Sequence, residues 1–197
     1  MGRWEPNARG RLERAALELY RDGGFEQTTV AEIAQRAGLT ERTFFRYFSD
    51  KREVLFAGAA RLQELLVDTV ANAPEPTQPL EAVVAALEVA GELLQENRDY
   101  AQQRQRVIAA NAELQERESI KLASLATAIA AALRERGVSP MAASLAGETG
   151  IAIFKIAFER WVDESNRLEL PALIRDALVE LSIMTSTERV RHRTPLA

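Results

Sequence analysis

One segment near the N-terminus, from Thr29 to Phe48, limits the fold more than any other part of the sequence. It opens with Thr29-Val-Ala-Glu32, a capping box in which the hydroxyl and the carboxylate each satisfy a free backbone N–H, so a helix should begin here. Gly38 can adopt the left-handed conformation that ends a helix, and Thr40 can cap the next one. The segment therefore predicts two short helices joined by a tight glycine turn.

The rest of the chain also has the character of helices. Ala, Leu, Glu, Arg and Gln are abundant, whereas there are only 10 Gly and 7 Pro in 197 residues, and three of those prolines fall in the linker 73–79. No period-two strand pattern is evident. Apolar residues recur every three or four positions and predict helices over residues 9–21, 29–37, 41–48, 51–70, 80–95, 99–110, 112–136, 140–164 and 171–185. We expect an all-α fold of about nine helices.

The charge of the chain is unevenly distributed. Residues 1–52 carry ten Lys and Arg against eight Asp and Glu, and the remainder carries fifteen against 21. A basic head on an acidic body suits a nucleic-acid partner for the head. We divide the chain into a basic head, residues 1–50, and an acidic body, residues 51–197.

Several classes of function find no support in the residues. There is no cysteine, and the one histidine, His192, stands in a terminal tail without neighbours that could orient it, so neither a metal site nor a catalytic imidazole is expected. No Gly-rich phosphate loop or cofactor motif is present, and no nucleophile stands beside a base. The longest nearly uncharged run, 122–133, is too short to cross a bilayer. We expect a cytoplasmic protein that is not an enzyme, with no cofactor.

The details of the N-terminal segment favour a helix-turn-helix. Small Ala34 stands where two helices must cross closely, and Leu39, Phe44 and Phe48 are spaced to share one core. In such a motif the second helix enters the major groove of DNA and its first residues meet base edges. The alternative is a helical hairpin used for packing alone, in a scaffold or partner-binding module, which predicts no salt-dependent DNA binding.

One run of the sequence resembles the N-terminal DNA-binding signature of TetR-type (TetR/AcrR) transcriptional regulators: TTVAEIAQRAGLTERTFFRYFSDKREVL. The resemblance is close from about Arg9 to Leu55 and extends to the body only in length and helical content. It implies a ligand-responsive regulator, most often a repressor. Such a protein binds a palindromic operator in double-stranded DNA as a homodimer and is released by a small-molecule effector.

The resemblance assigns roles in DNA binding to seven residues. Thr40 would cap the recognition helix near the backbone, while Arg42 and Thr43 would face base edges, and Arg42 can donate two hydrogen bonds to guanine O6 and N7. Phe45 stands where the family often has Tyr, so it offers apolar contact in place of a hydroxyl. Phosphate contacts that set the register are expected from Thr29, Tyr47 and Lys51. Arg3, Arg9 and Arg11 form either a groove-following arm or a plain basic tail.

For the body, the resemblance implies a four-helix dimer interface made by the last two helices of each subunit. Two apolar seams have the right spacing for it, and the alternative is that both seams pack within one subunit. The expected interface residues are Gly147, Ile151, Phe154 and Phe158 on one helix and Ile174, Leu178 and Leu181 on the last.

The resemblance also implies an effector pocket among the middle helices of the body. Candidates to line it are aromatic, polar and cationic residues: Tyr100, Arg104, Val107, Phe154 and Trp161. Each of them is also a plausible core or surface residue. No sequence feature identifies the effector, the operator or the regulated genes.

Overall fold

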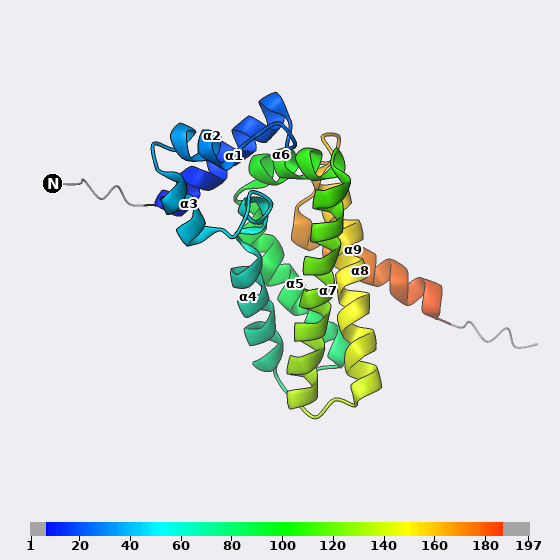
Figure 1. Cartoon of the computed structure of the whole chain (residues 1–197). Helices are drawn as coiled ribbons and strands as arrows, with labels where there is room; N and C mark the ends of the chain where they lie inside the picture. The colour runs from blue at the N-terminus through cyan, green and yellow to red at the C-terminus, as the bar shows by residue number, and fades with distance from the viewer. Residues whose placement is uncertain (1–6, 187–197) are drawn as a thin grey trace, which may run out of the picture.

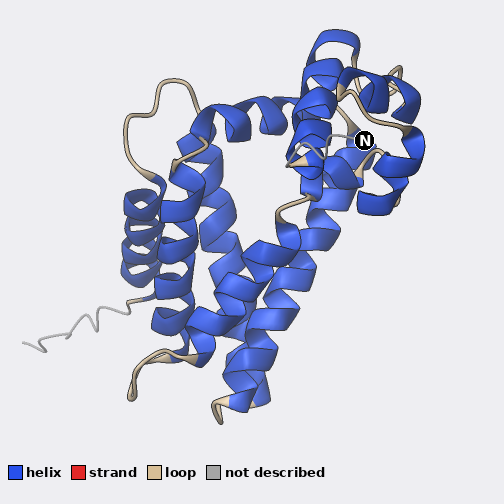
Figure 2. Cartoon of the chain, turned by 90° about the vertical axis from the view of Figure 1, so that its left-hand side faces the viewer, coloured by secondary structure: helices blue, strands red, loops and turns tan. Residues whose placement is uncertain are grey.

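The computed structural model describes residues 7–186, so Arg3 and His192 lie outside the described part of the chain. Within it the fold is all-α, as predicted, with a small head set on one end of a helical body (Figure 1). Figure 2 shows helices joined by short loops and no strand in the described residues. The elements are α1 (Ala8–Gly23), α2 (Val30–Arg36), α3 (Glu41–Tyr47), the 3-10 helix η1 (Glu53–Phe56), α4 (Ala59–Ala71), α5 (Pro79–Gln95), α6 (Arg98–Ala109), α7 (Ala112–Glu135), α8 (Pro140–Val162) and α9 (Leu170–Thr185).

The caps of the short head helices are the ones that the sequence predicts. Thr29 Oγ1 accepts from the backbone N–H of Glu32 at 3.2 Å, and the Glu32 carboxylate accepts from the N–H of Thr29 at 2.8 Å, which completes the capping box. Thr40 Oγ1 accepts from the N–H of Thr43 at the start of α3. Gly38 has a φ of 66°, the left-handed conformation required of the turn between α2 and α3. The local signals therefore fix both ends of the turn.

The expected continuous helix over residues 51–70 is wrong in its first third. Residues 51–52 form a turn, η1 covers Glu53–Phe56, and α4 begins only at Ala59. Val54, Leu55 and Phe56 are all buried, and three consecutive buried side chains do not fit an amphipathic α-helix, whose buried residues recur every three or four positions. The chain therefore wraps the base of the head before α4 enters the body.

The head has its own core, built around Phe44. This side chain is fully buried and contacts Phe48 with ring centroids 5.5 Å apart. The core extends beyond the N-terminal segment, because Val107 and Ile108 of α6 and Leu114 of α7 belong to the same cluster. Part of the body thus completes the core of the head.

The body is a bundle of α4, α5, α7, α8 and α9, with α6 lying across the end nearest the head (Figures 1 and 2). Helices α7 and α8 pack most extensively, and glycines of α8 allow the close approach of α7 at Gly147 and of α5 at Gly150. A Cβ added at Gly147 would lie 2.7 Å from the carbonyl oxygen of Ala126, and one at Gly150 would lie 2.3 Å from Val83 Cγ1. The tight packing of this bundle rests on bare backbone at these two positions.

One helix in the described part of the chain, α8, is long and apolar enough by composition to span a membrane. The nearly uncharged run 122–133 lies in a different helix, α7. Helix α8 lies within the bundle and contacts α5, α6, α7 and α9. Trp161 near its end is fully buried. These contacts are those of the core helix of a helical protein.

Candidate nucleic-acid interface

The exposed face of α3 carries the residues predicted to read DNA. Phe44 anchors the helix in the head core, and this leaves its neighbours on the outside. Arg42 is exposed and makes no hydrogen bond or ion pair with the described residues, whereas Phe45 is 55% exposed and meets the ring of Phe44 edge-on at 5.4 Å. At these two positions the helix therefore presents a guanidinium and an apolar ring to the exterior.

The two hydroxyls at the start of α3 are held together. Thr40 Oγ1 and Thr43 Oγ1 lie 3.0 Å apart, close enough for one to donate to the other. Both stand beside the free N–H groups of the first helical turn, where a phosphate oxygen is stabilised. This arrangement can present two hydroxyls to a single DNA strand.

Thr29 is already engaged in its cap. Its backbone N–H and its hydroxyl both donate to Glu32 Oε2 at 2.8 Å. The hydrogen bond from that backbone N–H, and then the one from the hydroxyl, lower the pKa of the Glu32 carboxyl below its usual range, so it is ionised at neutral pH. A phosphate approaching Thr29 would meet this carboxylate, which makes Thr29 a cap first.

Tyr47 is 39% exposed at the end of α3, and its hydroxyl accepts from Arg46 Nη2 at 3.2 Å. The guanidinium carbon of Arg46 also lies 4.9 Å from the centre of the tyrosine ring. Arg46 is not among the DNA-binding residues predicted from the sequence. Its signal was an Arg one residue before an exposed aromatic on the recognition helix, a pair that can bind one phosphate together.

The structure gives Lys51 a different setting from the phosphate contact predicted for it. Its Nζ donates to the carbonyl oxygens of Phe25, Glu26 and Thr28 at 2.8, 3.1 and 3.0 Å, which occupies all three of its protons. The ammonium also lies 4.4 Å from the centre of the Phe25 ring. Lys51 therefore ties the residues before η1 to the loop before α2, and its contact with phosphate stays a prediction.

Arg9 and Arg11 belong to α1 and do not form a separate arm. Arg9 pairs with Glu13 at 3.1 Å and donates to the carbonyl of Ala57, and Arg11 donates to the carbonyl of Ala37. Both therefore tie α1 to other parts of the head.

Ion pairs join η1 and the turn before it to α7. Glu53 of η1 accepts from Arg117 at 2.5 Å and from Lys121 at 3.0 Å, and Arg52 pairs with Glu113 at 2.7 Å. Burial opposes ionisation of Glu53, but the hydrogen bonds and charges of its two partners outweigh burial and lower its pKa.

A second link runs through α6. Arg104 Nε donates to the carbonyl of Leu55 at 2.7 Å, and its Nη1 pairs with Glu118 at 3.0 Å. Its guanidinium lies 5.0 Å from the centre of the Phe56 ring. A movement of α6 would therefore act directly on η1 through the contacts of Arg104.

Two family models match this chain. The one described as "Bacterial regulatory proteins, tetR family" matches residues 13–57, and the one described as "MftR C-terminal domain" matches residues 77–185. The chain belongs to the TetR family. The helix-turn-helix of this TetR-family chain is thus identified by sequence, by its caps and by its fold.

Curated relatives match part of this chain. The HTH-type transcriptional regulator TcmR of Streptomyces glaucescens is 37% identical over 78 residues, which are 40% of this chain and 34% of TcmR. The match thus spans about a third of that relative's length.

Solved structures resemble the whole chain at lower identity. The FadR repressor of Thermus thermophilus, in complex with lauroyl-CoA, is 24% identical with a TM-score of 0.57, and 96% of this chain and 100% of that one are covered. FadR of Bacillus subtilis, in complex with stearoyl-CoA, is 20% identical with a TM-score of 0.59, and the coverage is 87% and 96%. At these identities the likeness shows the TetR-type fold.

The predicted effector residues of this TetR-family chain do not come together in one site. Tyr100 and Val107 pack against the head core, and Arg104 bonds to η1. Phe154 and Trp161 belong to the core of the bundle. The five residues therefore divide between two cores, a separation that α6 creates by facing the head with one side and the bundle with the other.

Two buried polar atoms in the described part of the chain have no hydrogen-bond partner: Trp161 Nε1 and Gln105 Oε1. Gln105 follows Ala101 and Gln102 by one turn of α6, and Gln102 donates to the carbonyl of Val162, next to Trp161. The donor thus belongs to the end of α8 and the acceptor to α6, two helices that contact each other. Unpaired buried groups are rare in native proteins and point to a bound water or ligand.

The expected dimer seam is mostly core of the single subunit. Gly147, Ile151 and Phe154 are buried against the bundle, and so is Ile174, while Phe158, Leu178 and Leu181 are partly buried. Burial within one chain leaves these side chains unavailable to a second copy, so the alternative of packing inside the subunit describes the buried ones. The large apolar side chains that α8 and α9 leave exposed are Met141, Leu145, Ile156, Val179, Ile183 and Met184.

Proposed function

We propose that this TetR-family protein is a transcriptional regulator that binds a palindromic operator as a homodimer and is released by a small-molecule effector. The observation that carries the proposal is the outer face of α3. A helix anchored by buried Phe44 presents Thr40, Arg42 and Thr43 beside its capped N-terminus. This is the arrangement with which a recognition helix reads base edges and fixes its register on phosphates.

Arg42 is the main reader of base sequence in this proposal. It is exposed on the first turn of α3, and its planar guanidinium matches the two acceptors of guanine in the major groove. Arg42→Ala should cost about 1–3 kcal/mol of operator binding and relax the preference at one position of each half-site. Equal weakening on every sequence would make Arg42 a phosphate contact.

Homodimerisation uses the exposed apolar residues of α8 and α9. Leu145 and Ile156 are 63% and 55% exposed, and Ile183 is 64% exposed, on the two helices that form interfaces in this family. A second copy would cover all three and set the two heads at a fixed spacing. Leu145→Asp should give a folded monomer in sedimentation experiments, with Glu64→Lys as a control for an exposed charge change on α4.

We infer that the effector binds in the body next to α6. The unpaired donor of Trp161 and acceptor of Gln105 favour a mainly apolar ligand with one group that both accepts and donates a hydrogen bond. The FadR structures hold acyl-CoA molecules, so lauroyl-CoA is a natural first probe beside fatty amides and alcohols. Thermal stabilisation by a probe should be lost in Trp161→Phe.

The same placement supplies a mechanism for release. Because α6 bonds to η1 through Arg104, a ligand that favours a different position of α6 shifts the population toward heads that are wrongly spaced for DNA. A coupling of about 1–3 kcal/mol changes operator affinity by roughly 5- to 150-fold. A regulator with this role acts where the chromosome is, in the cytoplasm, and repression is the usual mode in the family.

Selection from a random pool of duplex DNA at two salt concentrations tests the proposal. An enriched palindrome whose binding weakens steeply with salt is the expected result. A folded protein that enriches no sequence at either concentration would favour the helical scaffold or partner-binding module and would refute the regulator.

A further inference from the structure

One arginine of α6, Arg98, binds three backbone carbonyls at the end of α8 and in the loop that follows it. Its Nε donates to the carbonyl of Trp161 at 3.1 Å, and its Nη2 donates to the carbonyls of Asp163 and Asn166 at 3.0 and 2.9 Å. Carbonyls of the last turn of a helix lack partners within the helix, and a cation near them interacts favourably with the helix dipole. Arg98 therefore caps α8 from a neighbouring helix.

Two glutamines extend this contact on either side of Arg98. Gln102, one turn further along α6, donates to the carbonyl of Val162 at 3.1 Å. Gln95, at the end of α5, accepts from the backbone N–H of Leu170 at 3.0 Å, where α9 begins. The corner between α5 and α6 thus holds the end of α8 and the start of α9 through their main chains. These are the two helices through which we propose that the chain dimerises.

The opposite face of α6 holds the head. Arg98 and Gln102 lie one turn apart on one side of this helix, and Arg104 and Val107 lie on the other. Arg104 donates to the carbonyl of Leu55 in η1 at 2.7 Å, and Val107 is buried in the head core. A helix of 12 residues therefore joins the head on one side to the end of α8 on the other, across the end of the body (Figures 1 and 2).

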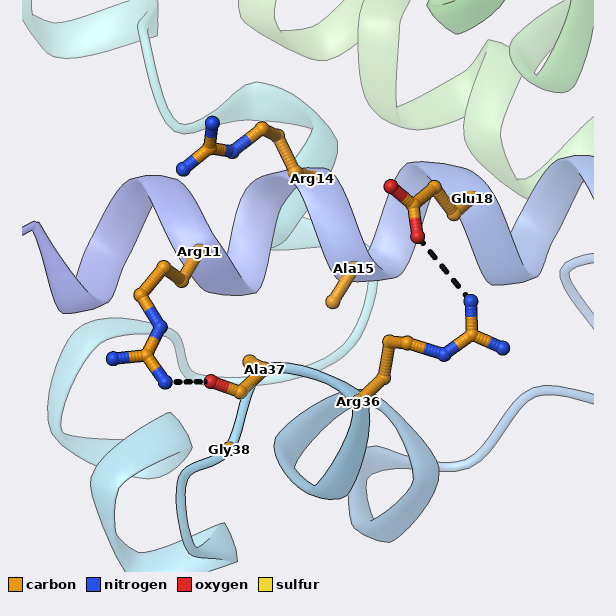
Figure 3. A pocket seen from close by; sticks show the side chains of 7 residues that line it. All are labelled: Arg11, Arg14, Ala15, Glu18, Arg36, Ala37 and Gly38. Atoms are coloured by element: carbon orange, nitrogen blue, oxygen red, sulfur yellow. Dashed lines mark hydrogen bonds and ion pairs between the residues drawn. The ribbon is translucent and has the colours of Figure 1, made fainter.

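The setting of Arg98 differs from that of arginines on the surface of the head. Figure 3 shows Arg36 paired with Glu18, both of them about half exposed, while the guanidinium of Arg14 points away from this pair. An exposed ion pair tolerates rotation of both side chains and contributes little to stability. Carbonyls of the main chain move only with the segment that carries them, so the bonds of Arg98 fix α6 to that segment.

We propose that Arg98 is a positioning residue that sets the spacing between the two heads of the dimer. It fixes α6 to the helices that dimerise, and α6 fixes the head, so the two recognition helices are presented at one separation. Helix α7 provides a second link to η1 through the ion pairs of Glu53, and removal of Arg98 should therefore relax the spacing without releasing the head. This inference rests on the proposed function, including dimerisation through α8 and α9.

Operators whose half-sites are moved together or apart by one and two base pairs test this role. Affinity of the wild type should peak at one spacing, because each added base pair shifts a half-site by about 3.4 Å and turns it around the DNA axis. Arg98→Met should lower the ratio of affinities between the best spacing and its neighbours by roughly fivefold or more, which is the lower end of typical couplings between distant sites.

Two further measurements separate this role from a general loss of function. Affinity of Arg98→Met for a duplex with a single half-site should equal that of the wild type, because α3 is unchanged. Its sedimentation should remain that of a dimer, because the exposed apolar residues of α8 and α9 are unchanged.

Arg106→Met is the matched control, because Arg106 lies two turns from Arg98 on α6 and pairs with the exposed side chain of Glu164. Its spacing profile should match that of the wild type. Gln102→Leu removes one bond to the end of α8 and should relax the profile less than Arg98→Met does. It tests the same contact should Arg98→Met fail to fold.

Unchanged spacing profiles in the folded variants at Arg98 and Gln102 would overturn the inference. An equal loss of affinity at every spacing and on the single half-site would also overturn it, because Arg98 would then stabilise the fold without setting the spacing. A wild type that is monomeric or binds no operator would instead refute the proposed function.

Discussion

Different kinds of interaction stabilise the head and the body of this protein. The head consists of short helices whose ends are fixed by specific polar contacts, such as the reciprocal cap of Thr29 and Glu32 and the three carbonyls bound by Lys51. The body consists of long helices packed through apolar side chains and bare glycine backbone. The polar caps thus fix the ends and orientation of the short head helices, whereas the body depends on the close fit of its long helices.

The largest expected effect concerns whether the head unfolds by itself. Phe44→Ala should cost about 3–5 kcal/mol of the free energy of unfolding, because it empties the centre of the head core. Since Val107, Ile108 and Leu114 belong to that core, urea denaturation should show one shifted transition for the whole chain. The neighbouring Phe45→Ala removes an exposed ring and should change stability by less than about 0.5 kcal/mol. A separate early transition of the head would show that the two regions are independent.

Gly147 tests the packing of the body. Gly147→Ala forces a Cβ against the backbone of Ala126 and should cost about 1–3 kcal/mol, measured by urea denaturation. The loss should be the same at low and high protein concentration, because the contact lies within one subunit. Gly23→Ala, with no atom within 4 Å of the added Cβ, should be neutral or slightly stabilising. A concentration-dependent loss at Gly147 would return this residue to the dimer interface.

A variant at Lys51 distinguishes a role in positioning the head from a direct contact with DNA. Lys51→Met keeps the aliphatic stem but leaves three carbonyls without their donor, so it should cost about 2 kcal/mol of stability in thermal or urea unfolding. Arg46→Met, on the exposed end of α3, should leave stability nearly unchanged and weaken DNA binding instead. Unchanged stability of the Lys51 variant with weaker binding on all sequences would restore the phosphate role expected from the family.

The smallest expected effect concerns the ion pairs of Glu53 with Arg117 and Lys121, which link η1 to α7, and it depends on pH. The lowered pKa of Glu53 means that the folded protein keeps this charge to lower pH than the unfolded chain does. Its stabilising contribution, about 1 kcal/mol, is complete above the ordinary value of 4.5 and is lost as the pH falls below it. Glu53→Gln should therefore flatten the fall in stability between pH 6 and pH 3. Glu64 is an exposed carboxylate on α4 without an ion pair among the described residues, so Glu64→Gln should leave that fall unchanged. Equal pH profiles of stability for the wild type and Glu53→Gln would show that the ion pairs of Glu53 do not stabilise the fold.

Local signals in the sequence predict most of the fold. The capping box at Thr29, the turn at Gly38 and the linker at 73–79 all depend on neighbouring residues, and the structure has each of them. The break at η1 depends on where Val54, Leu55 and Phe56 pack, which is a tertiary effect that helical periodicity does not register.

The candidate functional residues also fall into those that the sequence predicts and those that depend on tertiary packing. The residues of α3 could be predicted because a motif fixes which side of a short helix faces outward. Long apolar helices such as α8 have several apolar faces, and the sequence does not say which one packs against α7 and which stays exposed. The periodic spacing therefore predicts an interface at Ile151 and Phe154, which are buried in the subunit, and does not distinguish Leu145 and Ile156, which are exposed on the same helix.

Binding of the selected palindrome, measured by fluorescence anisotropy and sedimentation, tests the central claim. This claim is that two heads, held at a fixed spacing by dimerised bodies, bind one operator. The account predicts two chains per duplex, a steep salt dependence, and a preference over scrambled DNA that falls by about 1–3 kcal/mol in Arg42→Ala. Equal affinity for the palindrome and the scrambled duplex, or one chain per duplex at saturation, would contradict it.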